Sequence, residues 1–272
     1  MTARRIRFFP LLVPLVVLCI FAIYFHSNRT RAICQNVTSD GVDDPKSDTD
    51  EWGINWVLIP EGTFLMGCSK DDSDCTQWER PAHQVTVSEF FITRFEITQK
   101  QFELVMGYNP TSFDLCPDCA ADGLGLREAE EFCARVNAIL PTEAQWEYAA
   151  RGGTSTRYYC GDDEACLPDI AWYSYNSDGR PHVVGLKEPN AFGLYDVLGN
   201  VHEYVSDHFG PYTDDPQFDP LGPDNRQWSP LRGAGWASPA AGLRVSYRHA
   251  PDPFPYSVDG VRCAKWPLDR WD

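Results

Sequence analysis

Residues 189–207, which read PNAFGLYDVLGNVHEYVSD, place carboxylates on either side of a Gly-Asn pair and contain no lysine or arginine. A turn at Gly199 and Asn200 would let Asp196 and Glu203 converge, with the backbone carbonyls between them pointing the same way. Carboxylate and carbonyl oxygens are the ligands that Ca²⁺ takes in proteins. A solvated acidic loop is the alternative interpretation of the same residues.

The composition of the chain limits its partners. It has 272 residues, 43% of them hydrophobic, and a formal net charge of −16. This length predicts one large domain or two modest ones. Nucleic-acid binding requires lysine and arginine at the phosphates, so the charge argues against a nucleic-acid partner. An acidic surface suits a soluble domain that holds cations.

The N-terminus has the pattern of a targeting segment. Three arginines among the first seven residues precede an uncharged apolar run over residues 8–25. A positive flank followed by about 18 apolar residues is typical of an uncleaved anchor or a signal peptide. We expect residues 1–25 to be a signal anchor that leaves the domain facing the periplasm, the extracellular space or the secretory lumen. A cleaved signal peptide and a secreted product is the alternative.

A polar, acidic stretch follows the apolar run. Residues 26–52 are rich in Ser, Asp and Thr, which predicts a disordered tether with too little apolar content to fold. Asn28 and Asn36 fit the N-glycosylation pattern, which matters only in a eukaryotic secretory pathway. The folded domain is expected over residues 53–272.

Nine cysteines follow the apolar run: Cys34, Cys68, Cys75, Cys116, Cys119, Cys133, Cys160, Cys166 and Cys263. The close pairs Cys68/Cys75 and Cys160/Cys166 indicate local disulfides in an oxidising compartment. The odd count leaves at least one thiol unpaired. The C-x-x-C motif that begins at Cys116 is expected to be a loop disulfide, with a redox or zinc site as the alternative.

Alternation and capping signals predict a few short elements. Strands are expected over residues 56–60 and 63–67, paired as a hairpin, and over residues 84–92. Helices are expected over residues 99–106, after the cap Thr98, and over residues 127–139. A third helix should begin after Thr142, where Gln145 completes a capping box, and end at Gly152. Turns and short extended pieces follow.

Several stretches in order resemble the formylglycine-generating enzyme family, also called the sulfatase-modifying factor family. The matching segments are residues 59–67, 79–87, 95–98, 140–153, 190–201, 231–236 and 259–264. The resemblance implies an α+β fold, a divergent C-type-lectin-like architecture with little regular secondary structure. It also implies structural Ca²⁺ at the opening stretch, with side-chain oxygens from Asp196 and Glu203 and backbone carbonyls from Gly199 and Val201.

The segment that carries catalysis in the family differs in this chain. The enzymes that oxidise a sulfatase cysteine bind copper(I) through two cysteines after a Gly-Gly-Ser-Trp segment, and thiolates suit that soft ion. The equivalent residues 233–248 contain no cysteine, and Gly235 replaces the segment's serine. His202 and Tyr204 replace two tryptophans. Catalytic residues are therefore unknown, and copper-dependent oxidation has no visible chemistry.

These observations predict an exported, calcium-stabilised domain with a binding or maturation role toward an unidentified protein or peptide. The main alternative is a metal-dependent oxidase, and residual formylglycine-generating activity is a third reading. An iron site would need histidine and carboxylate ligands. The candidate histidines, each more simply explained as a hydrogen-bonded residue, are His83, His182, His202, His208 and His249. Arg244 and Arg248 are expected to pair with the acidic loops.

Overall fold

The computed structural model describes residues 47–111, 113, 116–224, 228–249 and 258–267. The apolar run and most of the predicted tether lie outside these residues. Within the described part of the chain, no helix has the length and apolar character that crossing a membrane requires. Short strands and helices alternate with long turns, which confirms an α+β fold with little regular secondary structure.

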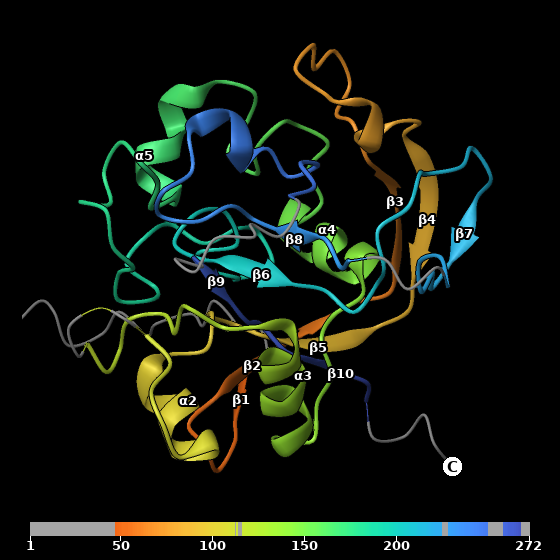
Figure 1. The fold of residues 1–272 in the computed structure, drawn as a ribbon. Helices are drawn as coiled ribbons and strands as arrows, with labels where there is room; N and C mark the ends of the chain where they lie inside the picture. The colour runs from red at the N-terminus through yellow and green to blue at the C-terminus, as the bar shows by residue number, and fades with distance from the viewer. Residues whose placement is uncertain (1–46, 112, 114–115, 225–227, 250–257, 268–272) are drawn as a thin grey trace, which may run out of the picture. The chain divides into compact units, whose positions relative to one another are not determined.

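The strands form three small sheets (Figure 1). The first has the order β1-β2-β5-β10 and consists of β1 (Ser47–Thr49), β2 (Asn55–Ile59), β5 (Phe90–Thr93) and β10 (Ala264–Lys265). The second has the order β3-β4-β7 and consists of β3 (Gly62–Met66), β4 (His83–Val87) and β7 (Gln217–Phe218). The third has the order β8-β6-β9 and consists of β8 (Leu231–Arg232), β6 (His202–Tyr204) and β9 (Asp259–Gly260).

The strand pairing differs from the predicted hairpin. β2 pairs with β1 and β5, whereas β3 pairs with β4, so the two strands predicted to form the hairpin belong to different sheets. The single strand predicted over residues 84–92 is two strands, because the Ser88 amide and hydroxyl both bind the Asp219 carboxylate at the break. β1 also lies within the predicted tether, so the fold begins earlier than residue 53.

The helices follow their predicted signals closely. α2 (Gln99–Met106) begins at Thr98, and α4 (Glu143–Arg151) begins at Thr142, each with a capping box. α3 (Leu126–Arg135) ends earlier than predicted, because Asn137 takes a left-handed φ of 56°. A one-turn helix, α5 (Leu167–Ile170), follows later in the chain.

α4 is the centre of the fold. All nine of its residues are buried, and it packs against β3 and β4 (Figure 1). Its Trp146 lies in one hydrophobic core with Phe90 of β5 and Leu194 of the 189–207 stretch. A second core includes Trp56, Phe102 of α2 and Phe132 of α3. Since α4 is polar as well as buried, its charged side chains need partners inside the protein.

Candidate functional site: an acidic loop and a cysteine-free segment

The Gly199-Asn200 turn predicted from the sequence is present. Gly199 has a φ of 90°, and a Cβ there would lie 2.4 Å from the Trp172 carbonyl oxygen, so only glycine fits. The Asn200 amide donates to the same carbonyl at 2.7 Å. Upstream, the Asn190 side chain donates to the carbonyls of Ala149 and Ala150 at the end of α4. The loop is therefore held at both ends by buried backbone.

Asp196 has a carboxylate oxygen suited to a cation. The residue is 1% exposed, and its Oδ2 accepts the Gly185 amide at 2.6 Å. Its Oδ1 is buried without a hydrogen-bond partner in the described part of the chain. Burial raises the pKa of Asp196 to about 6. A buried oxygen that lacks a donor is costly unless a proton or a cation compensates it.

Glu203 is engaged differently. Its carboxylate is fully buried and accepts the Trp146 Nε1–H at 2.6 Å. Arg262 lies against both oxygens, with Nε 3.0 Å from each and Nη2 2.9 Å from Oε1. Four donor contacts use the lone pairs that a carboxylate offers. In this arrangement Glu203 would have to exchange a protein donor for a metal ion.

The sequence reasoning missed Glu96, the residue that closes this cluster. Its two carboxylate oxygens accept the Val201 amide at 3.0 Å and the Asn200 side-chain amide at 2.5 Å. Burial, followed by the negative charges of Asp196 and Glu203, raises the pKa of Glu96. Glu96 belongs to the 95–98 segment of the resemblance, which was the available signal.

The charge balance of this acidic cluster favours a cation. Three buried carboxylates, those of Glu96, Asp196 and Glu203, lie close to the guanidinium of Arg262, and the Lys187 ammonium also acts on Asp196, so the carboxylates outnumber the cations by one. Asp196 offers a free oxygen and fits a calcium ligand, whereas Glu203 fits only after rearrangement. No group of three His, Cys, Asp or Glu side chains in the described part of the chain already converges as a metal site. The four-residue calcium site stays a prediction.

The segment over residues 233–248 is compact and tied to the acidic loop. The Gly199 amide donates a hydrogen bond to the Gly233 carbonyl at 2.8 Å. The Trp236 amide donates one to the Asn200 carbonyl at 2.7 Å. The segment therefore packs on the same turn that the sequence singled out. It presents no thiol to this region.

Cysteines elsewhere in the described part of the chain are all paired. The disulfides join Cys68 to Cys75, Cys116 to Cys119, Cys133 to Cys263, and Cys160 to Cys166. The local pairs predicted from spacing are thus confirmed, and so is the loop disulfide at the C-x-x-C motif. Cys34 lies outside the described residues. No described cysteine remains as a thiolate ligand for copper.

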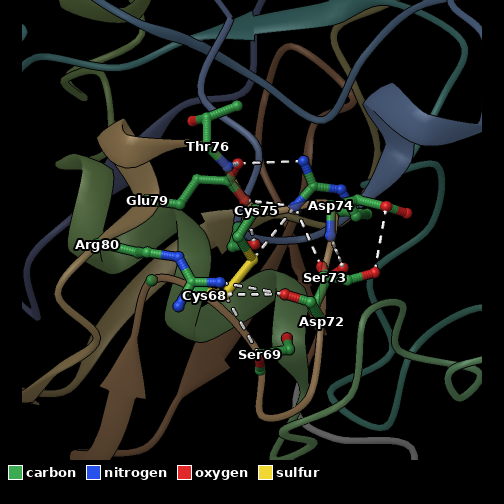
Figure 2. The surroundings of a disulfide bond; sticks show 12 residues. Cys68, Ser69, Asp72, Ser73, Asp74, Cys75, Thr76, Glu79 and Arg80 are labelled. Carbon is green, nitrogen blue, oxygen red and sulfur yellow. Dashed lines mark hydrogen bonds and ion pairs between the residues drawn. A yellow bond between two sulfur atoms is a disulfide. The ribbon is translucent and has the colours of Figure 1, made fainter.

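Arg244 and Arg248 both form buried ion pairs, but only Arg244 pairs with an acidic loop as predicted, and Arg248 pairs with a helix. Figure 2 shows the loop closed by Cys68 and Cys75, with Asp72 and Glu79 near that disulfide. The Arg244 guanidinium binds Asp72 at 3.1 Å and Glu79 at 2.5 Å. Arg248 binds Glu143 of α4 at 2.7 Å. Both arginines thereby fix the cysteine-free segment to the rest of the domain.

The buried charges of α4 extend this ion network. Arg232 of β8 contacts Glu143 at 2.9 Å and Glu147 at 2.6 Å, and Glu147 also contacts Arg151 at 2.8 Å. Asp207 accepts the Glu143 amide at 2.6 Å. Burial raises the pKa of Asp207 to about 7. Most of these groups neutralise one another, which is how a polar helix survives in the core.

The candidate histidines are dispersed. His182 stacks on Trp172 with ring centroids 3.9 Å apart, and His83 packs against Tyr212 at 4.8 Å. Only His202 and His249 lie together, at 4.5 Å between centroids. No contact of His208 is described, and no iron-type cluster forms in the residues that the structure covers.

A cavity of about 390 Å³ borders the ion network and is lined by Glu143, Asp207, Tyr212 and Arg248, among others. A second cavity, of about 300 Å³, opens beside the Cys116 to Cys119 disulfide. Its walls include Phe113, Val183 and Leu186, with Arg180 and His182 as polar groups. A mainly apolar hollow with a few polar groups is typical of ligand-binding sites.

Comparisons with known proteins agree on one family. Residues 42–266 match the model of the sulfatase-modifying factor enzyme 1-like domain. The serine/threonine-protein kinase pkn1 of Chlamydia caviae is 28% identical over 275 residues, which cover 89% of this chain and 43% of the kinase. The chain thus spans less than half the length of that relative.

Two further relatives match over most of their own length. The inactive C-alpha-formylglycine-generating enzyme 2 of Bos taurus is 28% identical over 278 residues, covering 78% of this chain and 88% of that protein. Among solved structures, Treponema denticola variable protein 1 aligns with a TM-score of 0.73 and 27% identity, over 82% of this chain and 100% of its own. The chain belongs to the sulfatase-modifying factor family, which includes the formylglycine-generating enzymes.

Proposed function

We propose that this chain is an exported, calcium-stabilised member of the family that acts as a binding or maturation factor in the envelope or secretory lumen. The observation that carries the proposal is the absence of cysteine from residues 233–248, the segment in which the family's oxidases hold copper(I). A relative whose name includes "inactive" supports the same direction. The domain keeps the family's framework without its thiolates.

Two observations support export. The apolar run of residues 8–25 follows a positive flank, which is typical of a signal anchor or signal peptide. The domain also contains four disulfides, which form and persist in oxidising compartments. We infer a domain tethered to the membrane by its N-terminal segment, with secretion after cleavage as the alternative.

Calcium would have a stabilising role in this proposal. Asp196 would supply its unpartnered oxygen, Gly199 and Val201 their carbonyls, and Glu203 a second carboxylate. When bound, the ion supplies positive charge and no redox chemistry. Its charge would offset the excess negative charge of the acidic cluster formed by Glu96, Asp196 and Glu203.

The cavity beside the Cys116 to Cys119 disulfide suits a protein or peptide partner. Its apolar walls would accept a hydrophobic side chain, while Arg180 would face a carboxylate or carbonyl group of the partner. The Phe113 ring also packs edge-to-face against Trp236 of the cysteine-free segment, with ring centroids 5.3 Å apart. Partner binding would therefore occur next to the segment that carries catalysis in related enzymes.

Elemental analysis of the protein produced through a secretory route is the first test. Calcium without iron or copper is the expected result, together with no conversion of a cysteine-containing sulfatase peptide to formylglycine. Stoichiometric copper or iron, with oxygen consumption in the presence of thiols, would contradict the proposal and favour a metal-dependent oxidase.

The calcium component has a separate test. Replacing Asp196 and Glu203 together with alanine should lower the melting temperature and abolish its rise on adding calcium. A ligand present at 100 times its Kd stabilises the native state by about 2.7 kcal/mol, which is readily measured by differential scanning fluorimetry. An unchanged calcium response in the double variant would refute the assignment of Asp196 and Glu203 as calcium ligands. Asp214→Ala, at an exposed position, is the control.

A further inference from the structure

A serine, a histidine and an aspartate meet beside the acidic loop. The Ser238 hydroxyl oxygen lies 3.3 Å from Nε2 of His202. On the other side of the same ring, Nδ1 lies 3.3 Å from Oδ1 of Asp259. The hydroxyl, the imidazole and the carboxylate thus follow one another in the order that activates a serine nucleophile.

Backbone pairing fixes the histidine and the aspartate relative to each other. β6 and β9 are parallel neighbours, and His202 is directly opposite Asp259 in their register. The His202 amide donates to the Val258 carbonyl at 2.8 Å. Tyr204 holds the other carboxylate oxygen of Asp259 through its hydroxyl at 3.1 Å. Nδ1 of His202 makes no hydrogen bond in the described part of the chain, so its 3.3 Å approach to Oδ1 of Asp259 is a contact without hydrogen-bond alignment. Catalytic hydrogen bonds of unliganded sites are often poorly aligned and tighten only in the substrate complex.

Ser238 is held equally firmly. Its amide donates to the Gly235 carbonyl, and the Gly235 amide donates back to the Ser238 hydroxyl oxygen at 3.1 Å. This bond occupies one acceptor site of the oxygen and leaves the hydroxyl proton available to His202. A Cβ at Gly235 would lie 3.3 Å from the His202 amide nitrogen, so glycine permits the close approach of the two segments.

The three side chains are largely buried. Ser238 is 8% exposed and the His202 side chain 13% exposed, so only a small part of each is open to a reagent. The His249 ring packs against His202 with centroids 4.5 Å apart and limits its rotation. A restrained imidazole in a largely dry site is favourable for general-base catalysis.

We propose that Ser238, His202 and Asp259 form a nucleophilic site that accepts acyl groups from esters. In the reaction, the Ser238 oxygen forms a bond to the carbonyl carbon while His202 takes the hydroxyl proton. The ester C–O bond then breaks, and the alcohol leaves with that proton. Water attacks the acyl-serine and restores the hydroxyl, so the sum is ester plus water giving acid plus alcohol.

This activity goes beyond the proposed binding role, and no step of it uses calcium or copper. Asp259 would act through the His202 ring, so it is a positioning residue, whereas Ser238 and His202 would contact the substrate. The position is notable chemically, because His202 and Ser238 lie where the resemblance places a tryptophan and the catalytic thiols. A hydroxyl nucleophile would there replace a redox-active sulfur.

An alkyl fluorophosphonate tests the site directly on the whole purified protein. The serine oxygen would bond to phosphorus, fluoride would leave, and the proton would pass through His202 to solvent. Peptide mass spectrometry should locate the adduct on Ser238 and not on Ser174, an exposed serine whose amide binds the Ser238 carbonyl. Ser174→Ala is the matched control and should be labelled like the parent protein.

The variants separate chemistry from folding. His202→Gln should slow labelling by on the order of 100-fold, and added imidazole should restore part of the rate to His202→Ala. Asp259→Asn should also slow labelling, with partial recovery in Asp259→Glu. Absence of any Ser238 adduct on folded protein, while a known serine hydrolase is fully labelled, would overturn the proposal.

A cysteine variant provides an independent measurement if Ser238→Ala disturbs the turn. Ser238→Cys keeps the geometry and replaces the hydroxyl by a thiol that iodoacetamide alkylates. Alkylation should be at least about tenfold faster when His202 is present than in Ser238→Cys with His202→Gln, because the imidazole favours the thiolate. Equal rates in the two variants would refute the role of His202 as the base.

Discussion

Replacing Arg262 with methionine tests the central electrostatic inference about the acidic cluster. The fully buried guanidinium binds the Glu203 carboxylate and also donates to the Thr93 carbonyl at 2.7 Å and the Tyr195 carbonyl at 2.8 Å. Methionine preserves much of the side-chain length and removes every one of these donors. The variant leaves Glu203 and Glu96 charged or protonated in the core without a compensating cation.

The expected loss of unfolding free energy follows from these contacts. Removing one partner of a buried ion pair costs about 3–5 kcal/mol, because the other charge stays buried without compensation. Domains are stable by about 5–15 kcal/mol in total, so this change brings the protein close to unfolding. Glu203→Gln in the same background should recover part of the loss, since the amide oxygen still accepts the Trp146 Nε1–H and no charge remains. We expect a coupling energy of about 1.5–3 kcal/mol between the two sites.

Urea titrations followed by tryptophan fluorescence, with disulfides intact and divalent cations chelated, measure the four corners of this cycle. Arg135→Met is the matched control, because Arg135 and Glu131 are 2.6 Å apart but 47% and 54% exposed. That exposed pair should contribute less than about 1 kcal/mol. If Arg262→Met and Glu203→Gln were additive within about 0.5 kcal/mol, the pair would not be coupled and the reasoning about the cluster would fail.

Two further predictions concern pH and disulfides. Burial raises the pKa of Asp207 to about 7, above an unfolded value of about 4, so only the folded state keeps this proton between those pH values. Its contribution to stability is therefore present at low pH and lost as pH rises toward 7. Asp207→Asn should reduce that decline in urea titrations at pH 5 and pH 8, the rest being due to Asp196 and Glu96, whose pKa values are also raised. An equal decline in both proteins would exclude Asp207 as a source. Replacing Cys133 and Cys263, 130 residues apart, with serine should cost about 5 kcal/mol of unfolding free energy, against about 2 kcal/mol for Cys160 and Cys166, which are 6 residues apart. Equal losses in calorimetry would contradict the chain-entropy argument.

Local signals predicted the helices well because their determinants are adjacent in sequence. Thr98 and Thr142 each cap a helix through a residue three positions later, and Gly107 and Gly152 end those helices in a left-handed conformation. Such caps form the same contacts whatever the tertiary fold. The predicted end of α3 was too late, because apolar spacing alone marked it. Asn137, where the chain turns, has no capping pattern that the sequence would show.

Strand pairing was the weakest part of the sequence reasoning. Residues 56–60 and 63–67 have the alternation of a hairpin, but alternation states only which face is buried and not which strand lies alongside. The partner of β2 is β5, more than 30 positions away, and the partner of β6 is β9 near the C-terminus. The pairs of β6 with β8 and β9 also connect segments that no local pattern relates.

The acidic loop shows the same limit at the level of charge. Asp196 and Glu203 were found because they flank one turn, whereas the arginine that neutralises Glu203 is 59 residues away. Glu96 is more than 100 residues from the amide groups that donate hydrogen bonds to it. A sequence can indicate that carboxylates gather, but their counter-ions become known only when distant segments are placed.

The arrangement of the arginines explains how the fold can persist while its chemistry changes. Arg232, Arg244, Arg248 and Arg262 tie the C-terminal segments to α4 and to the acidic loops through buried carboxylates. None of these contacts uses the backbone turn that carries Ser238. The turn is thus fixed at its borders by charge pairs, and its own side chains are free to vary without loss of those pairs. On this argument, substitutions at the turn should alter reactivity far more than stability, whereas substitutions at the four arginines should do the reverse.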